Sequence, residues 1–182
     1  NLVDDRDQYK FFHAHTFSPN QLNLRLSMFW FNHFTIGMKG ETHNFIGHSW
    51  AQILSLLDGS FKDLLYYSIC HPGMLSYLDN IYSFGPRSER GRNDGVSLND
   101  NLARELLELH TVSPAAQYSE KDIHEAAKVL TGWGAGGFDY KWSPRPSSWK
   151  EAWRRNAAEP GRKIVLGKSI ASGKKGLREL TD

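Results

Sequence analysis

The sequence is poor in cysteine and in long apolar runs, and both absences narrow what the chain can be. Cys70 is the one cysteine among 182 residues, so no internal disulfide framework holds the fold. No apolar run approaches the ~18–20 residues that a membrane-crossing helix needs. With 40% hydrophobic and 23% charged residues, the composition is that of a globular protein rather than of a disordered chain.

Several catalytic and metal-binding motifs are also missing. The eight histidines form no His-x-x-x-His or His-Glu-x-x-His spacing, and a single cysteine excludes a Cys-x-x-Cys pair, so the sequence holds no zinc motif. A Gly-x-x-x-x-Gly-Lys phosphate loop and a Gly-x-Ser-x-Gly nucleophile elbow are absent as well. The glycine-rich run 132–137 has no predicted strand before it and no helix after it, so we interpret it as a flexible turn.

Charge is divided unevenly along the chain. Lys and Arg outnumber Asp and Glu by 11 to 4 in residues 141–182, whereas residues 1–140 hold 11 against 16. Trp142, Trp149 and Trp153 alternate with cations. Trp149 and Trp153 are four residues apart, as are Lys150 and Arg154, and this spacing predicts a short amphipathic helix over 148–156. This segment either packs on the helical core or binds an anionic glycan or cell-envelope ligand. No nucleic-acid module is recognisable, so we expect no nucleic-acid partner.

Apolar spacing predicts helices over most of the remaining chain. Leu22, Leu26, Phe29, Trp30 and Phe34 recur at helical intervals, which predicts a helix from 22 to about 36 with this face inward. Further helices are expected at 46–57, 61–70, 72–78, 101–110 and 119–132, a loop at 83–97, one short strand at 163–167 and the start of a helix at 174–182. The expected fold is all-α: an irregular multi-helix domain with a helical core over about 20–132, an irregular, basic, Trp- and Pro-rich segment over 133–182, and at most a short β element near 163–167.

The helix predicted over 101–110 carries the strongest chemical signal. Its polar side gathers Asn101, Arg104, Glu105 and Glu108, opposite an apolar side formed by Leu102, Ala103, Leu106, Leu107 and Leu109. The polar side is either a solvated face with one ion pair between Arg104 and Glu108, or a cleft in which two carboxylates share a divalent cation or divide acid and base roles. His110 points about 160° away from Glu108 on a continuous helix, so it joins them only if the helix breaks.

Three other histidine positions offer alternatives. His33 falls on the apolar face of its helix and is expected to be buried, as a core residue or as an acid–base group. His71 precedes Pro72 and either caps the next helix or serves as a ligand. The pair His13 and His15 shares a face only in an extended chain, and in a helix the two rings point apart.

Several segments resemble, in order, the bacterial family known as domain of unknown function 1800. The run 99–111, Asn-Asp-Asn-Leu-Ala-Arg-Glu-Leu-Leu-Glu-Leu-His-Thr, is close to that family's signature. Similar matches are the segments 29–34 (Phe-Trp-Phe-Asn-His-Phe), 61–65 with 71–80, 118–123 with 130–133, and 163–167 (Lys-Ile-Val-Leu-Gly), so the resemblance covers about residues 20–170.

The resemblance implies a mainly helical, exported or periplasmic bacterial protein, encoded beside a sulfatase-like envelope partner. It implies no activity, because the family has none established. Family domains are more than twice this length, so we expect a single partial domain, truncated at both ends. The family also carries a His-Asp pair before its Lys-x-x-Leu-Gly segment, whereas residues 156–161 read Asn-Ala-Ala-Glu-Pro-Gly here. A site that depends on that pair is expected to be missing.

Two functional hypotheses follow from the sequence. The first is a hydrolase-like enzyme with a metal-assisted site on the helix over 101–110. Its expected catalytic residues are Glu105, Glu108, Arg104 and His33, its expected metal ligands are Glu105, Glu108 and His71, and Asn101 and His110 are expected to line the cleft. The alternative is a non-enzymatic binding or scaffold protein for a cell-envelope partner or an anionic glycan. The first predicts convergent polar side chains, and the second predicts an exposed apolar or basic patch instead.

Overall fold

The computed structural model describes residues 2–95, 98–134 and 152–182, and this part of the chain is mainly helical. The α-helices are α1 (Leu2–Phe17), α2 (Gln21–His33), α3 (Ile46–Ser55), α4 (Phe61–Ile69), α5 (Pro72–Tyr77), α6 (Glu89–Asp94), α7 (Asn101–Glu105), α8 (Glu120–Leu130) and α9 (Gly173–Thr181). Short 3-10 helices are η1 (Gly40–Phe45), η2 (Asn80–Tyr82) and η5 (Arg155–Ala157). Four short strands form two antiparallel pairs: β1 (Trp133–Gly134) with β2 (Ala152–Trp153), and β3 (Lys163–Val165) with β4 (Lys168–Ile170). The predicted all-α class is confirmed, because each pair adds only a few residues of strand.

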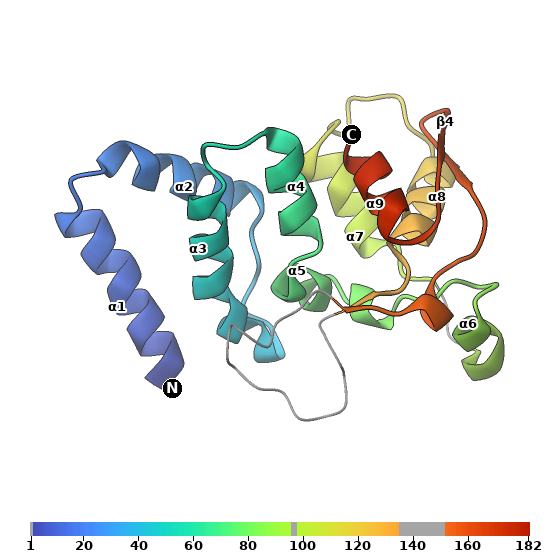
Figure 1. The fold of residues 1–182 in the computed structure, drawn as a ribbon, viewed down its shortest axis with the longest axis horizontal. Coiled ribbons are helices and arrows are strands. Elements are labelled where there is room, and N and C mark those ends of the chain that lie inside the picture. Colours follow the sequence, from blue (N-terminus) through green and yellow to red (C-terminus); the bar gives the residue numbers. More distant parts are fainter. Residues whose placement is uncertain (1, 96–97, 135–151) are drawn as a thin grey trace.

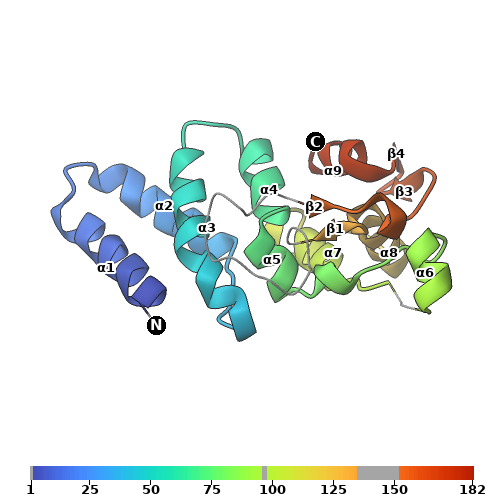
Figure 2. The same ribbon diagram turned by 60° about the horizontal axis from the view of Figure 1, so that its bottom comes forward.

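The helices are arranged along the chain from one end of the molecule to the other (Figure 1). α1 and α2 form one end, α3 packs against α2, and α7 packs against α8 near the opposite end. The C-terminal α9 returns to contact both α8 and α4, and the turned view shows it lying with β3 and β4 over α8 (Figure 2). The main core is built from apolar side chains of α4, α5, α7 and α8, closed by Trp133 and Leu177.

Several helices begin where the sequence predicts a cap. The Ser60 and Ser119 side chains accept hydrogen bonds from the backbone N–H groups of Asp63 and Asp122, as expected for N-cap serines. His71 caps α5, and Pro72 occupies its first turn. These local bonds satisfy N–H groups that a helix start leaves without an intrahelical partner, so the starts of α4, α5 and α8 agree with the sequence-based prediction.

The buried face of α2 differs from the prediction. Leu22, Leu26 and Phe29 are exposed, with relative accessibilities of 69%, 43% and 60%, whereas Leu24 and Ser27 are buried. α3 packs against α2, and Trp50 of α3 donates its indole N–H to the Ser27 hydroxyl at 3.1 Å. The side of α2 that faces α3 is therefore the one with a polar partner. The predicted face is wrong for Leu22, Leu26 and Phe29, whereas Phe34 is buried and Trp30 packs against the core as expected.

The helix predicted over 101–110 changes its winding after Glu105. α7 ends there, and the chain continues as a single π-helical turn, η3 (Leu106–His110). A wider turn rotates the following side chains away from their α-helical positions. Leu109, which was predicted to face inward, is consequently 61% exposed, whereas His110 is buried.

The segments predicted as a loop and as a basic helix also differ. Within the predicted loop over 83–97, residues Glu89–Asp94 form α6, capped by Ser88. Of the helix predicted over 148–156, the part before residue 152 lies outside the described residues, and the rest is β2 followed by η5. Trp133, predicted in a flexible turn, instead pairs with Trp153 across β1 and β2. The prediction of at most one β element near 163–167 was therefore wrong for 133–134 and 152–153. These two strands have only two residues each and lie far apart in the sequence, so no alternation of apolar and polar residues marks them.

The helical part of the chain extends beyond the expected core of about 20–132 on both sides. α1 lies before it, and α9, whose start was predicted, lies after it. Because α1 is helical at His13 and His15, these rings do not form the pair that an extended chain would bring onto one face. Among the residues that the structure describes, no helix combines the length and the apolar character needed to cross a membrane.

Candidate functional site

Arg104 is the centre of a polar cluster where α7 meets α8. Its Nη2 donates to the Glu120 carboxylate at 2.8 Å and to Asp100 at 3.3 Å, and its Nη1 donates to Glu108 at 3.3 Å. The predicted ion pair between Arg104 and Glu108 is therefore confirmed, and Asp100 and Glu120 extend it into a cluster of three carboxylates around one guanidinium.

Local and tertiary structure both contribute to this cluster. Asp100 and Glu108 lie one helical turn before and after Arg104, at i, i+4 spacing. Glu120 lies 16 residues away and is brought in because α7 packs on α8, whose start is set by the Ser119 cap. The hydrogen bond to Arg104 lowers the pKa of Glu120 below its usual value, and the same bond raises the pKa of Arg104. Both groups are therefore ionised at neutral pH.

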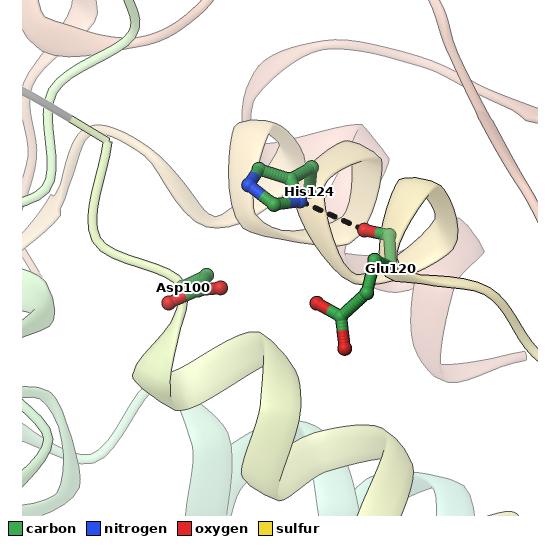
Figure 3. Close-up of side chains that lie close together, drawn as sticks. All are labelled: Asp100, Glu120 and His124. Carbon is green, nitrogen blue, oxygen red and sulfur yellow. Dashed lines mark hydrogen bonds between the residues drawn. The ribbon is translucent and has the colours of Figure 1, made fainter.

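Asp100, Glu120 and His124 form the one group of three metal-ligating side chains found in the described part of the chain. Their ligand atoms lie within 4.8 Å of one another, and Figure 3 shows them facing the same space from α8 and from the start of α7. His124 Nδ1 lies 2.8 Å from the Glu120 carbonyl oxygen, so Nδ1 is the donor and Nε2 of the neutral ring presents its lone pair. Two carboxylates and one imidazole are a ligand set that suits divalent transition metals.

The structure places the sequence-predicted ligands differently. Glu108 belongs to the Arg104 cluster, but Glu105 and Glu108 do not form a three-ligand group with His71 among the described residues. Glu105 is half-buried on α7, and Asn101, which was expected to line the cleft, is exposed at the helix start. The roles assigned to Glu105, Glu108 and His71 stay predictions.

His33 and His110 lie beside each other. The His33 Nε2 donates to the backbone carbonyl of His110 at 3.1 Å, and their ring centroids are 5.7 Å apart, beside Phe34. His33 is half-buried and His110 is buried, and no described residue forms a hydrogen bond with Nδ1 of His110. Burial lowers the pKa of His110 to about 4, so this ring is neutral at pH 7. The break in the helix brings His110 to His33 rather than to Glu108.

His71 serves as a buried cap with a second histidine beside it. Its Nδ1 accepts the backbone N–H of Gly73 at 3.1 Å, so its proton is on Nε2, which lies 2.8 Å from Nδ1 of His48. Burial lowers the pKa of His71 to about 3, and the neighbouring His48 adds to this shift. The capping role that the sequence left open for His71 is therefore the one seen, while its role as a ligand stays a prediction.

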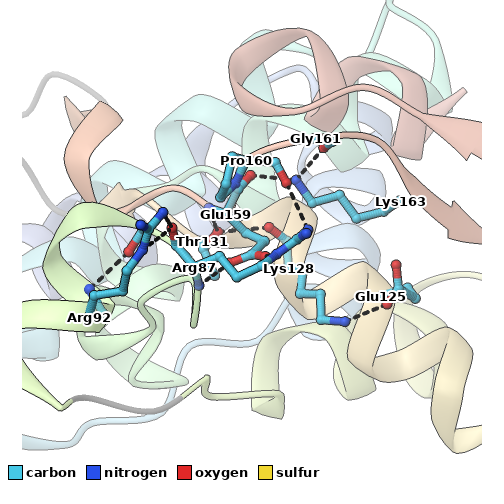
Figure 4. A network of polar contacts seen from close by, with 11 residues as sticks. Arg87, Arg92, Glu125, Lys128, Thr131, Glu159, Pro160, Gly161 and Lys163 are labelled. Carbon is cyan, nitrogen blue, oxygen red and sulfur yellow. Dashed lines mark hydrogen bonds and ion pairs between the residues drawn. The ribbon is translucent and has the colours of Figure 1, made fainter.

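The segment 156–161 contains a buried carboxylate. Glu159 is buried and accepts two hydrogen bonds from Arg87, one from the backbone N–H at 2.8 Å and one from Nε at 2.6 Å. Lys163 is also buried and donates to the carbonyl oxygens of Glu159 and Gly161 (Figure 4). Burial lowers the pKa of Lys163 to about 8. These contacts fix residues 159–163 against the loop before α6.

The tryptophan-rich basic segment is only partly described. Trp142 and Trp149 lie outside the described residues. Arg154 donates its Nη2 to the Ile81 carbonyl at 2.7 Å and lies over the Phe84 ring, 5.4 Å from its centroid. Burial lowers the pKa of Arg154. This cation therefore packs on the helical part of the molecule, which is the simpler of the two interpretations drawn from the sequence.

The sequence-based prediction missed the three potential metal ligands beside Arg104, namely Asp100, Glu120 and His124. Glu120 and His124 are four residues apart on a helix whose start the capping motif predicts. Their positions on the same face of that helix could therefore have been predicted from the sequence. Asp100 is adjacent to Asn101 in the sequence. What no local pattern shows is the contact between α7 and α8 that brings Asp100 to Glu120.

Comparisons with known proteins support one family. Neither the curated proteins nor the solved structures contain a match to this chain. The family described as "Protein of unknown function (DUF1800)" matches residues 3–182, which is nearly the whole chain. Since the match extends from α1 to α9, the chain belongs to the DUF1800 family.

Proposed function

We propose that Asp100, Glu120 and His124, which lie beside Arg104, form a divalent-cation site that supports metal-assisted hydrolysis. The observation that carries this proposal is the convergence of Asp100, Glu120 and His124, whose ligand atoms lie within 4.8 Å of one another. Asp100, Glu120 and His124 would hold the cation, and a cation bound there would supply Lewis-acid chemistry, polarising a substrate oxygen and activating a water as nucleophile at neutral pH.

Arg104 has two effects in this proposal. Its guanidinium contacts both carboxylates of the ligand group, so it neutralises their charge and competes with a cation for them. With a cation held by Asp100 and Glu120, Arg104 would retain its contact with Glu108 and would be free to bind an anionic oxygen of the substrate. Glu108 lies outside the ligand group, 3.3 Å from Arg104, and is the candidate general base; it is one of the two carboxylates that the sequence suggests for this role. Glu105 has no such link to the cluster and serves as a control.

The alternative function is a binding or scaffold protein without catalysis. It is supported by the exposed apolar side chains of α2, namely Leu22, Leu26 and Phe29. That hypothesis also predicts the absence of convergent polar groups, however, and the Arg104 cluster is convergent, so we favour the metal site. Export and a sulfatase-like envelope partner are also part of this proposal, and both rest on family membership alone. Recovery of a sulfatase-like protein together with the tagged protein from cell envelopes tests the proposed partner.

Manganese binding measured by calorimetry on metal-free protein tests the site. The wild type is expected to bind one Mn²⁺ ion, and Glu120→Gln and His124→Ala are each expected to weaken binding at least about tenfold, because each removes one of three ligands. Arg104→Gln is expected to strengthen binding, because it removes a competing positive charge about 3 Å from both carboxylates.

Glu105→Gln is the matched control, because it changes a half-buried carboxylate of the same helix. Its Mn²⁺ affinity is expected to equal that of the wild type. A wild type that binds no Mn²⁺, or a Glu120→Gln variant that binds it unchanged, would refute the proposed site. Loss of binding in Glu105→Gln but not in Glu120→Gln would assign the metal to the ligands predicted from the sequence instead. Hydrolysis of p-nitrophenyl esters should require Mn²⁺ and be lost in Glu108→Gln with metal affinity retained.

A further inference from the structure

A second candidate site is a cavity lined by arginines between α6 and η5. It has a volume of about 360 Å³, and its walls include Arg87, Arg92 and Arg155 together with Glu89, Asn156 and Pro160. α6 contacts η5 directly, and Gly85 donates its backbone N–H to the Ala157 carbonyl at 2.9 Å. A side chain at residue 85 would come within 2.5 Å of the Glu159 backbone, so glycine allows this close approach. The two walls of the cavity are thereby fixed to each other.

The guanidinium groups of Arg87 and Arg92 are held in place by hydrogen bonds to protein groups. The buried Glu159 carboxylate accepts hydrogen bonds from Nε and from the backbone N–H of Arg87, and these bonds orient the Arg87 side chain. Nη2 of Arg87 donates a further hydrogen bond to the Pro160 carbonyl at 3.2 Å. Arg92 donates its Nε and Nη2 to the Arg87 carbonyl at 3.0 and 2.6 Å (Figure 4). None of these contacts uses the Nη1 atom of either arginine, so each retains donors for a ligand.

The charge of the cavity wall is positive. Glu89 is the one carboxylate among its lining residues, against three guanidinium groups, and the Glu159 carboxylate lies behind Arg87 and is already bonded to it. Arg155 is exposed and follows β2, on the wall opposite α6. Guanidinium groups bind phosphate and sulfate oxygens through paired N–H donors, and prior fixing of the side chains reduces the entropy lost on binding.

We propose that this arginine cavity binds the phosphate or sulfate monoester of a sugar-sized molecule. A tetrahedral oxyanion ester accepts hydrogen bonds from several guanidinium groups at once. The volume falls in the range of about 300–1,000 Å³ typical of small-molecule sites, so it accommodates more than the bare anion. Asn156 offers amide groups for hydroxyls, and Pro160 offers an apolar surface for a ring. The proposal does not depend on the metal site around Arg104.

Calorimetric titration with inorganic phosphate, glucose 6-phosphate and glucose 6-sulfate tests this site on the metal-free chain. At least one sugar ester is expected to bind saturably and more tightly than inorganic phosphate. The double variant Arg92→Ala/Arg155→Ala is expected to lower that affinity at least about tenfold, because each lost charged hydrogen bond weakens binding by about that factor. Arg87 is kept, because it pairs with the buried Glu159. Glu89→Gln is expected to raise the affinity, because it removes the carboxylate from the wall.

Arg25→Ala is the matched control, since Arg25 is an exposed arginine on the distant α2. It is expected to bind the esters like the wild type. Binding of only one of the two esters assigns the site to that ester and supports the proposal. The proposal is overturned if neither ester binds saturably, if inorganic phosphate binds as tightly as the esters, or if Arg25→Ala loses as much affinity as the double variant. Circular dichroism of each variant confirms that the helices are intact.

Discussion

Lowering the pH from 6.5 toward 5 is expected to reduce the free energy of unfolding, because two buried histidines resist protonation in the folded state. The folded pKa is about 3 for His71 and about 4 for His110, against an ordinary value of 6.5. Between these values the unfolded chain binds more protons than the folded chain, so acid favours unfolding. Each histidine contributes a loss approaching about 1.4 kcal/mol per pH unit once the pH is well below 6.5. Above pH 6.5 the stabilisation is fully present.

The structure gives a reason for the shift at His71 besides burial. Its Nδ1 accepts the backbone N–H of Gly73, so a proton on Nδ1 would remove the cap of α5 and bring two donors face to face. Urea unfolding at pH 7.0, 6.0, 5.5 and 5.0 measures the effect. This range lies above the values of 3.8 to 4.5 at which carboxylates such as Asp122 and Glu120 ordinarily titrate.

His71→Asn separates titration from capping. Asparagine is a good N-cap residue without a titrating ring, so the variant is expected to keep α5 and to show a shallower dependence of stability on pH. An unchanged slope in His71→Asn would contradict the assignment of the pH dependence to His71.

Replacing Trp133 with alanine is expected to lower the free energy of unfolding by about 3–5 kcal/mol, the usual loss for a large aromatic side chain in a core. Trp133 is fully buried, and its ring lies edge-on to Tyr66 with centroids 6.4 Å apart. Its backbone pairs with Trp153, and its carbonyl accepts the Asn80 side-chain amide at 3.1 Å. Removal of the indole leaves a cavity where β1 meets the helical core. The melting temperature should fall on the order of 10 °C for a domain of this size.

Two variants control for composition and for hydrogen bonding. Phe29→Ala removes an aromatic ring that is 60% exposed and is expected to change stability by less than about 0.5 kcal/mol. Trp133→Phe keeps much of the volume and removes an indole N–H that has no hydrogen-bond partner among the described residues, so its loss of stability should be smaller than that of alanine. Thermal unfolding followed by circular dichroism compares them. If Trp133→Ala were as stable as Phe29→Ala, the placement of Trp133 in the core would be wrong.

Features that depend on contacts within about four residues were predictable from the sequence. The caps at Ser60 and Ser119 involve groups three residues apart, and the pair of Arg104 and Glu108 spans one helical turn. A short strand was expected over 163–167, and residues Lys163–Val165 form it. Such interactions form wherever the segment adopts its local structure, so a single sequence is sufficient to read them.

Which faces pack together was decided by the tertiary structure. On α2, burial follows Leu24 and Ser27 rather than the more apolar stripe with Phe29, because α3 approaches the side that carries a polar partner for Trp50. The π-helical turn at Leu106–His110 rotates His110 inward, which helix periodicity does not predict.

In the candidate site, too, some contacts could be predicted from the sequence and others depend on how the helices pack. The sequence predicted that the helix over 101–110 carries the strongest chemical signal, and it predicted the ion pair between Arg104 and Glu108. Asp100 and Glu120 are twenty positions apart, and their carboxylates meet at Arg104 because α7 packs against α8. A contact of that kind depends on the burial of two helix faces against each other, which no spacing within either helix encodes. The local chemistry was therefore visible in the sequence, and the set of side chains that can act together was determined by packing.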